Sequence, residues 1–288
     1  MTLTQAQQEH YRRHGFVTRL PAFDAQETAE LRKQVELLET EHAEGAGRHS
    51  LNNLFRVNGH LVIPLLAEIA RKPLILDQVA GVLGPNLLVW SVELFIKEPQ
   101  STAVVSWHQD LTYWGMGETD EELTARVALS DVSEEAGCMR FIPGSLQQRI
   151  VDHHDTFDVD NLLSRGQHIK GIEEAEAVHG PLAPGQMSFH HGRCFHASGP
   201  NKSNDRRIGC AIRYVTPEVK QSDSGQDYAM LVRGMDHVQG WINVAAPVTL
   251  FDPEDVRRYN EILAHQSSTL AAGAENDVKM YAATGTRT

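Results

Sequence analysis

The sequence of 288 residues predicts a mainly β fold with flanking helices, whose core is an antiparallel sandwich or barrel. Helix-period patterns fill the first 84 residues, and short runs of β-forming residues follow from Leu87 to about Pro217. Glycine and proline turns separate these runs, and no helical pattern alternates with them, which disfavours a parallel α/β sheet. Because all-β cores often use this length as one unit, we expect one domain over residues 1–266.

Three segments of the N-terminal part, together covering about residues 4–84, are expected to be helical. A short helix is expected to begin at Thr4, a favoured N-cap, and to end at Gly15. A longer helix is expected over residues 24–44, where aspartate is the N-cap and apolar residues recur at helical spacing. Residues 61–83 predict one or two further helices, with a break near Pro73.

The β-rich part begins at Leu87, where the composition changes to β-branched and aromatic residues. Turn dipeptides such as Pro143-Gly144 end its short runs. Strands are expected at 87–97, 126–132, 138–142, 186–190 and 208–215. A terminal helix is expected over 251–264, with proline in its first turn, and a mobile tail over 267–288.

Composition limits the classes of function. Apolar residues make up 41% and charged residues 22% of the chain, which is ordinary for a globular protein. A formal net charge of −12 and the lack of a basic stripe argue against nucleic acid as a partner. No run approaches the roughly 18 apolar residues of a membrane span, and no signal sequence opens the chain, so we expect no membrane partner and a cytoplasmic location. The cysteines match no zinc pattern and are expected to be reduced and buried: Cys138, Cys194 and Cys210.

The run from Ala103 to Asp110 is the first candidate for a functional site. It reads as a β-branched strand that ends in a histidine and, two residues later, an aspartate. Because side chains alternate along a strand, His108 and Asp110 leave the same face and can bind one metal ion. An imidazole and a carboxylate are two thirds of the 2-His-1-carboxylate facial triad, which holds non-haem Fe(II). The third ligand would be a histidine from a distant strand.

A second pattern of the same spacing, His153-His154-Asp155, competes with the first. It follows a polar stretch without apolar alternation, so we interpret it as a loop or strand end whose charges face solvent. The alternative for His108 and Asp110 is a polar pair at a strand end that binds no metal.

A histidine-rich stretch near residue 195 is the second candidate. His196 follows an apolar pair and precedes a Ser-Gly-Pro-Asn turn, so a strand would carry it to the edge of the barrel as the third ligand. Arg207 begins the next strand and could meet the carboxylate of a cosubstrate with its planar fork. The alternative is a surface arginine beside Arg206. We interpret His190 and His191 as pocket lining or as partners of backbone groups rather than as metal ligands.

These motifs, in this order, resemble those of the phytanoyl-CoA dioxygenase family of Fe(II)- and 2-oxoglutarate-dependent oxygenases, over about residues 4–217. The similar stretches are residues 9–17, Trp107-His108-Gln109-Asp110, residues 137–145, and residues 196–203 followed by Arg207. Four elements in family order are far more specific than any one of them alone.

The resemblance implies a double-stranded β-helix, a cupin-like jelly roll over about residues 87–217, with helices packed outside. It implies Fe(II) ligands at His108, Asp110 and His196. It also implies that Arg207 pairs with the distal carboxylate of 2-oxoglutarate and that Ser198 places a hydroxyl beside it. With O2 as the second cosubstrate, the implied reaction is hydroxylation of an unactivated carbon of a small-molecule substrate, with release of succinate and CO2.

Two alternatives to hydroxylation stay open. A related oxidation, such as demethylation, desaturation or halogenation, is one, although a halogenating relative has a small residue where this chain keeps Asp110. A non-catalytic cupin-like protein that binds a metal or another ligand is the other. Such a protein would have no reason to keep Arg207 and Ser198 at the family's spacing.

The substrate is not readable from the sequence, but several residues near the motifs are candidates for contacting it. Tryptophan and tyrosine rings could wall the pocket or face a cation, and arginines could hold an anion, while packing under the barrel rim is the alternative. The candidates are Trp107, Tyr113, Trp114, Arg140 and Arg193. Lys97 could approach the cosubstrate from a neighbouring strand.

Overall fold

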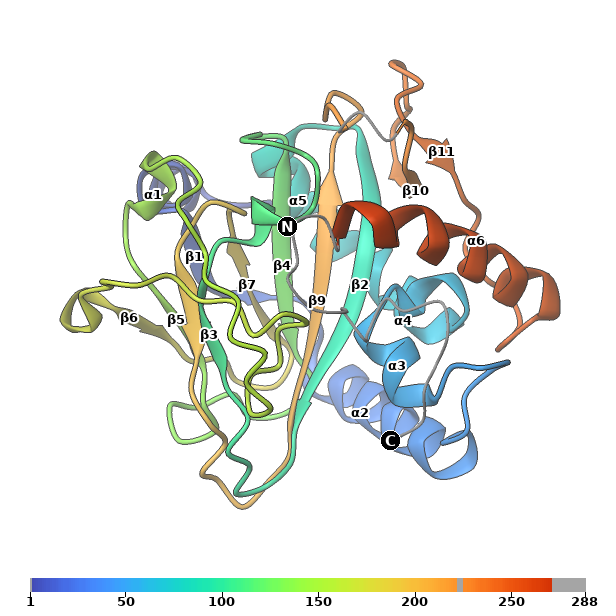
Figure 1. Cartoon of the computed structure of the whole chain (residues 1–288), viewed down its shortest axis with the longest axis horizontal. Coiled ribbons are helices and arrows are strands. Elements are labelled where there is room, and N and C mark those ends of the chain that lie inside the picture. Colours follow the sequence, from blue (N-terminus) through green and yellow to red (C-terminus); the bar gives the residue numbers. More distant parts are fainter. Residues whose placement is uncertain (1, 222–224, 271–288) are drawn as a thin grey trace.

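The fold is a jelly roll with helices packed outside, as a computed structural model that describes residues 2–221 and 225–270 shows (Figure 1). The larger sheet has the order β1-β7-β4-β9-β2-β10-β11, and the smaller one the order β3-β8-β5-β6. All pairings between these strands are antiparallel except that of β10 with β11. The larger sheet contains β1 (Phe16–Pro21), β2 (Leu87–Lys97), β4 (Glu122–Ala128), β7 (Gln186–His190), β9 (Arg207–Val215), β10 (Tyr228–Arg233) and β11 (Ile242–Asn243). The smaller sheet contains β3 (Val105–His108), β5 (Met139–Phe141), β6 (Val178–Gly180) and β8 (His196–Ser198).

The helices confirm most of the N-terminal prediction. They are α1 (Gln5–His14), α2 (Ala25–Glu41), α3 (Leu51–Arg56), α4 (Pro64–Ala70), α5 (Pro73–Leu83) and α6 (Pro253–Leu270). Thr4 and Asp24 each form a capping box at the start of their helix, and Gly15 ends α1 with a left-handed φ of 85°. The short helix α3 was not expected. None of the helices within residues 2–221 and 225–270 is long and apolar enough to cross a membrane.

Two predicted boundaries were wrong. β4 runs over Glu122–Ala128 rather than 126–132, because the strand begins at alternating charged and apolar residues whose charged members face inward. The chain has left the sheet by Val132, which forms an isolated bridge with Leu182. Helix α6 extends to Leu270, so the first residues of the expected mobile tail are helical. The rest of that tail, 271–288, lies outside the described residues.

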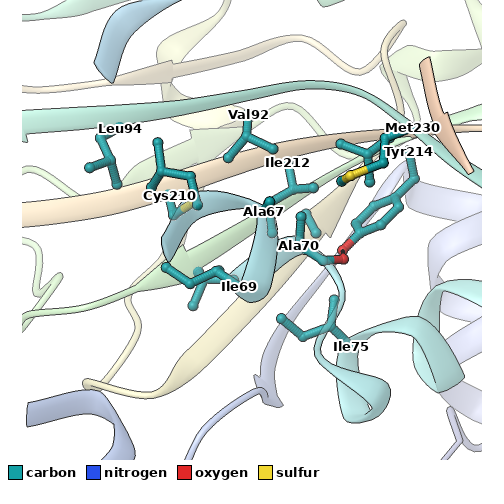
Figure 2. Close-up of a cluster of buried hydrophobic side chains, with 14 of the residues drawn as sticks. Ala67, Ile69, Ala70, Ile75, Val92, Leu94, Cys210, Ile212, Tyr214 and Met230 are labelled. Carbon is teal, nitrogen blue, oxygen red and sulfur yellow. Dashed lines mark hydrogen bonds between the residues drawn. The ribbon is translucent and has the colours of Figure 1, made fainter. Parts of the chain in front are cut away.

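The outer face of the larger sheet is apolar and packs against helices that include α3, α4 and α5 (Figure 1). Figure 2 shows β2 and β9 contributing Val92, Leu94 and Ile212 against α4. The hydroxyl of Tyr214 donates to the carbonyl of Ala70 at 2.7 Å, so even the polar atom of this buried ring is satisfied. Burying each such large side chain stabilises the fold by about 1.5–3 kcal/mol.

The inner face of the same sheet is polar, because neighbouring residues of a strand point to opposite faces. Cross-strand pairs place Lys97 opposite Arg207 and Thr124 opposite both His190 and Arg213. The inner face thus collects ionisable side chains in the space between the two sheets, and the functional site is formed there.

His60, in a 3-10 turn over Gly59–Leu61, makes stability depend on pH. Its ring is 1% exposed, neither ring nitrogen has a hydrogen-bonding partner among the described residues, and burial lowers its pKa to about 3. Since the folded-state pKa lies below the unfolded value of about 6.5, this contribution is complete above pH 6.5 and is lost as pH falls towards 3. We expect wild type to lose about 2 kcal/mol through this group between pH 7 and 5.

His60→Leu should lack that component of the pH dependence. Denaturant unfolding of both proteins at the two pH values measures it, because all other titrating groups cancel in the comparison. Equal losses in the two proteins would contradict a buried, neutral His60.

Candidate metal centre

Two histidines and one aspartate meet between the two sheets. The potential ligand atoms of His108, Asp110 and His196 all lie within 4.8 Å of one another, and all three residues are buried. His108 at the end of β3 pairs directly with His196 at the start of β8. Nε2 of His108 lies 3.3 Å, and Nε2 of His196 3.8 Å, from Oδ1 of Asp110. The structure therefore brings together the three residues that the sequence motifs singled out.

Asp110 does not lie on the strand that was expected to carry it. β3 ends at His108, and Asp110 begins a 3-10 turn over Asp110–Thr112. The turn directs the carboxylate back towards the two imidazoles, where other groups hold its second oxygen: Thr124 donates to Oδ2 at 3.1 Å, and Nε2 of His190 lies 3.2 Å from it. His190 thus orients the candidate ligand, which agrees with the expectation that it lines the pocket.

The backbone fixes the orientation of both candidate histidine ligands. Nδ1 of His108 lies 2.8 Å from the carbonyl of Ser106, and Nδ1 of His196 lies 2.9 Å from the carbonyl of Cys194. Because these carbonyls can only accept, each Nδ1 carries the proton and each Nε2 presents its lone pair to the centre.

The protonation states suit a divalent metal. Burial opposes ionisation of Asp110, but the surrounding imidazoles, led by His196, hold the pKa of its carboxyl well below the usual value. Burial and the neighbouring rings of His108 and His190 keep the pKa of His196 well below its usual value. Two neutral imidazole nitrogens and one carboxylate form the donor set that Fe(II) accepts in facial triads, so the residues present fit this ion.

The triad lines a cavity of about 40 Å³, and Arg207 lines one end of it. Lys97 is buried opposite Arg207 on the neighbouring strand β2. Arg207 is 1% exposed and donates to Oγ of Ser198 at 3.3 Å, while Nζ of Lys97 donates to the same oxygen at 2.9 Å and to the carbonyl of Gly199 at 2.6 Å. Burial, followed by the charge of Arg207, lowers the pKa of Lys97 to about 6. No carboxylate of the described residues forms an ion pair with either cation, and this is the environment that a ligand carboxylate would complete.

Arg206 follows Asn204-Asp205 in a turn, which predicts that it faces solvent, away from the cavity. The structure shows its side chain only partly exposed. Its guanidinium forms ion pairs with Glu39 of α2 at 2.7 Å and with Glu98 at 2.7 Å. It therefore ties α2 to the end of β2. Gly209 stands two residues after Arg207 and so on the same face of the strand, which predicts clear space beside Arg207. That prediction is wrong, because Nε of Arg126 lies 3.1 Å from where a Cβ of residue 209 would stand.

The competing motif is not solvated either. Nε2 of His153 accepts a hydrogen bond from the backbone N–H of Gln109 at 2.9 Å, and Asp155 forms an ion pair with Arg165 at 2.5 Å. Burial lowers the pKa of His153 to about 4, so the ring is neutral and can accept. His153 thus supports the chain between the two ligands of the first motif, which a reading of its polar surroundings missed.

His153→Ala is expected to destabilise the fold by about 1–3 kcal/mol, because it leaves the N–H of Gln109 buried without an acceptor. Iron binding should persist, since His108 and Asp110 keep their other contacts. Urea unfolding and the iron content of the purified variant test this, with His154→Ala as the matched control for an exposed neighbour. Loss of iron in His153→Ala with iron retained in His108→Ala would show that the second motif is the metal site.

Two of the five candidate substrate residues lie beside the metal centre. Tyr113 and Trp114 line a second cavity of about 60 Å³, which shares His108 and Asp110 with the first. The ring of Trp114 packs on Trp90 at a centroid distance of 5.1 Å. These rings form part of a wall between the metal centre and the outside.

The other three candidates have structural partners. Nε1 of Trp107 donates to Glu174 at 3.1 Å, and Arg140 forms an ion pair with the same carboxylate at 2.8 Å while lying over the tryptophan ring. Arg193 forms an ion pair with Asp120. Packing at the rim, the alternative considered from the sequence, describes these three residues.

Several polar residues of the cavities were not found from the sequence. They come from the inner face of β2, β4 and β9: Glu93, Thr124, Arg126 and Arg213. The available signal was the placement of charged residues at every second position between apolar ones, which indicates a strand with one polar, enclosed face.

Comparison with known proteins gives consistent results. The family model described as "Phytanoyl-CoA dioxygenase (PhyH)" matches residues 11–209. A protein of Stutzerimonas stutzeri, named a probable alpha-ketoglutarate-dependent hypophosphite dioxygenase, is 30% identical over 252 residues, which cover 81% of this chain and 87% of that protein. The solved structure of the non-heme monooxygenase ThoJ without ligand is 32% identical, has a TM-score of 0.82, and covers 93% of this chain and 99% of its own. The fold is also that of CytC3 with Fe(II) and alpha-ketoglutarate, at 21% identity and a TM-score of 0.62 over 86% of this chain and 99% of that one.

Proposed function

We propose, since this chain belongs to the phytanoyl-CoA dioxygenase family, that it hydroxylates an unactivated carbon of a small-molecule substrate. The chain is a non-haem iron dioxygenase that depends on 2-oxoglutarate, and its cofactors are Fe(II), 2-oxoglutarate and O2. This class of activity excludes a non-catalytic binding protein. The observation that carries the proposal is the buried triad beside the buried pair of Lys97 and Arg207.

The roles of the site residues follow from their contacts. His108, Asp110 and His196 would hold the iron, and Thr124 with His190 keeps the carboxylate oriented. When bound, the iron and its cosubstrates supply an oxidant, with conversion of 2-oxoglutarate to succinate and CO2.

Arg207 would receive the distal carboxylate of 2-oxoglutarate with two parallel hydrogen bonds. The Oγ of Ser198, which accepts from both Arg207 and Lys97, keeps its own proton to donate to that carboxylate. Lys97 adds a second positive charge, and the approach of a carboxylate favours its protonated form.

The remaining residues of the two cavities position the substrate and exclude water. Phe95 and Leu163 line both cavities and give them apolar surface beside His108 and Asp110. Leu163 belongs to a segment that is attached to the barrel, since Nδ2 of Asn161 donates to Oγ of Ser106 at 2.9 Å. The retained Asp110 favours hydroxylation, demethylation or desaturation over halogenation.

The proposal includes one domain over residues 1–266 and a location in the cytoplasm. Three buried cysteines without disulfide bonds support a reducing compartment.

A substrate screen tests the reaction type. The protein is supplied with Fe(II), 2-oxoglutarate and air, succinate release is followed, and each product mass is measured. We expect succinate in a one-to-one ratio with a product that has gained one oxygen atom. A product that has lost two hydrogens, or gained chlorine in excess chloride, would contradict hydroxylation, while the complete absence of 2-oxoglutarate turnover would contradict the function as a whole.

A further inference from the structure

Positive side chains outnumber carboxylates around the two cavities. The cations that line the cavities are Arg56, Arg126, Arg207 and Arg213, and the carboxylates that line them are Glu93 and Asp110. Lys97 and Glu122 are buried nearby but line neither cavity. Fe(II) and the 2-oxoglutarate dianion would cancel each other, so two positive charges remain in excess. The balance is the same whether Lys97 and Glu122 are both charged or both neutral.

We call the second cavity, lined by Tyr113 and Trp114, the outer cavity, and the cavity beside Arg207 the inner cavity. We propose that this enzyme acts on an anionic substrate, whose carboxylate or phosphorus oxyanion group is bound in the outer cavity by Arg213 and Arg56. This inference rests on the proposed function and names the substrate class of the same site. An excess of buried positive charge destabilises a protein unless an anion balances it, because water is excluded from the surroundings. When it binds, an anionic substrate supplies the negative charge that balances this excess.

The position of Arg213 separates it from the cosubstrate. Arg207 and Arg213 lie six residues apart on β9, which corresponds to about 20 Å along the strand, so they approach the cavities from opposite ends. Across the sheet, Arg207 stands opposite Lys97 of β2, whereas Arg213 stands opposite Thr124 of β4. The hydroxyl of Thr124 donates a hydrogen bond to Asp110. The cation near the metal end is therefore Arg213, and it lines both cavities.

Arg56 approaches the same outer cavity from helix α3. One of its terminal nitrogens donates to the carbonyl of Leu162 at 2.7 Å, in the segment that covers the site. Its guanidinium lies 4.3 Å from the centre of the Phe95 ring, which holds it over the cavity wall. Arg56 and Arg213 can thus reach one ligand from two different elements.

Arg126 contributes to the positive charge of the cavity that Arg207 also lines. It is 8% exposed, lines the inner cavity and packs 4.4 Å from the centre of the Phe95 ring. Its Nε has no hydrogen-bonding partner among the described residues, so this side chain keeps a donor that a ligand in the same cavity can use.

Arg213 forms an ion pair with Glu93 at 3.1 Å, and this pair does not exclude a second anion. A guanidinium has five donors and can serve two carboxylates. Glu93 lines the outer cavity as well, so it should repel an anionic ligand that Arg213 attracts. The two residues therefore predict substitution effects of opposite sign.

The test is a binding titration of the protein loaded with Fe(II) and 2-oxoglutarate under argon, at constant ionic strength. Acetate is compared with acetamide, and methylphosphonate with dimethyl methylphosphonate. We expect each anion to bind at least about tenfold more tightly than its neutral counterpart, and the tighter anion identifies the carboxylate or phosphorus class. Equal binding of charged and neutral probes would overturn the inference.

Three variants locate the subsite. Arg213→Gln and Arg56→Gln should each weaken anion binding roughly 10-fold or more, and Glu93→Gln should strengthen it. The double variant Glu93→Gln/Arg213→Gln removes the ion pair as a unit and serves if Arg213→Gln alone does not fold; it should bind anions more weakly than Glu93→Gln. Weaker anion binding in both Glu93→Gln and Arg213→Gln would overturn the assignment. Unchanged anion binding in both Arg56→Gln and the double variant would overturn it as well.

The visible absorption band that 2-oxoglutarate produces with bound Fe(II) is recorded in each sample. If the band is present but the anions do not bind, only the inference of an anionic substrate is wrong. Its absence in wild type would instead count against the proposed function.

Discussion

Asp110→Ala should abolish turnover of 2-oxoglutarate and lower iron affinity by well over about 100-fold. Loss of a residue that only supports a ligand typically costs 10–100-fold in metal affinity, and Asp110 would itself be a ligand and the one negative charge in the triad. The fold should persist, because the partners left behind, such as Thr124 and the neutral ring of His196, are uncharged, so the change leaves no unpaired buried charge. Iron content, the unfolding midpoint and succinate release together measure the effect.

The matched control for this change is Thr124→Val, which deletes the hydroxyl that donates to Asp110 and keeps the shape of the side chain. We expect it to weaken iron binding by roughly 10-fold, within the range for a residue that orients a ligand. His196→Ala should resemble Asp110→Ala. Full turnover in Asp110→Ala would show that the triad is not the metal site.

Arg207→Ala should raise the 2-oxoglutarate requirement by roughly 30-fold or more, because removing a buried partner of a carboxylate typically costs about 2–5 kcal/mol. Arg207 is buried at one end of the cavity, next to Ser198 and Lys97, with no carboxylate of the described residues paired to it. Lys97 would remain and preserve some affinity. Titration of 2-oxoglutarate against succinate release measures the change.

Arg206→Ala is the control, since the adjacent residue of the strand faces away from the cavity. It should alter the 2-oxoglutarate requirement by less than about threefold, as partly exposed ion pairs contribute only about 0–1 kcal/mol. Its effect should appear as a small loss of stability, because the pairs with Glu39 and Glu98 connect α2 to the barrel. If Arg206→Ala raised the 2-oxoglutarate requirement more than Arg207→Ala, the face of β9 that carries Arg206 would be the one lining the cavity, which contradicts the assignment.

The predictable parts of the fold are those with a local physical cause. Caps at Thr4 and Asp24, prolines at the start of α4 and α5, and the apolar run of β2 define their elements without reference to the rest of the chain. The predicted position of β4 was wrong because charged residues argue against a buried strand unless that strand is known to face a polar cavity. Local propensity cannot supply that information.

The residues of the candidate site also divide into those that a local pattern reveals and those that only the folded structure reveals. His108, Asp110, His196 and Arg207 stand in short motifs with recognisable spacing, and they were found. The supporting role of His153 depends on a hydrogen bond between residues 44 positions apart, which no local pattern encodes.

The charges of β2, β4 and β9 were missed for a related reason. Arg126 and Arg213 stand next to apolar residues and belong to no motif. Only the pairing of β4 with β9 in the folded structure shows that the two arginines line one cavity. A substrate site assembled across strands in this way requires the three-dimensional structure.

A crystal structure of the protein grown anaerobically with Fe(II) and 2-oxoglutarate tests the central assignment most directly. We expect iron bound to Nε2 of His108, the carboxylate of Asp110 and Nε2 of His196, with the distal carboxylate of 2-oxoglutarate on Arg207. Iron at His153 and Asp155, or a 2-oxoglutarate carboxylate away from Arg207, would contradict it.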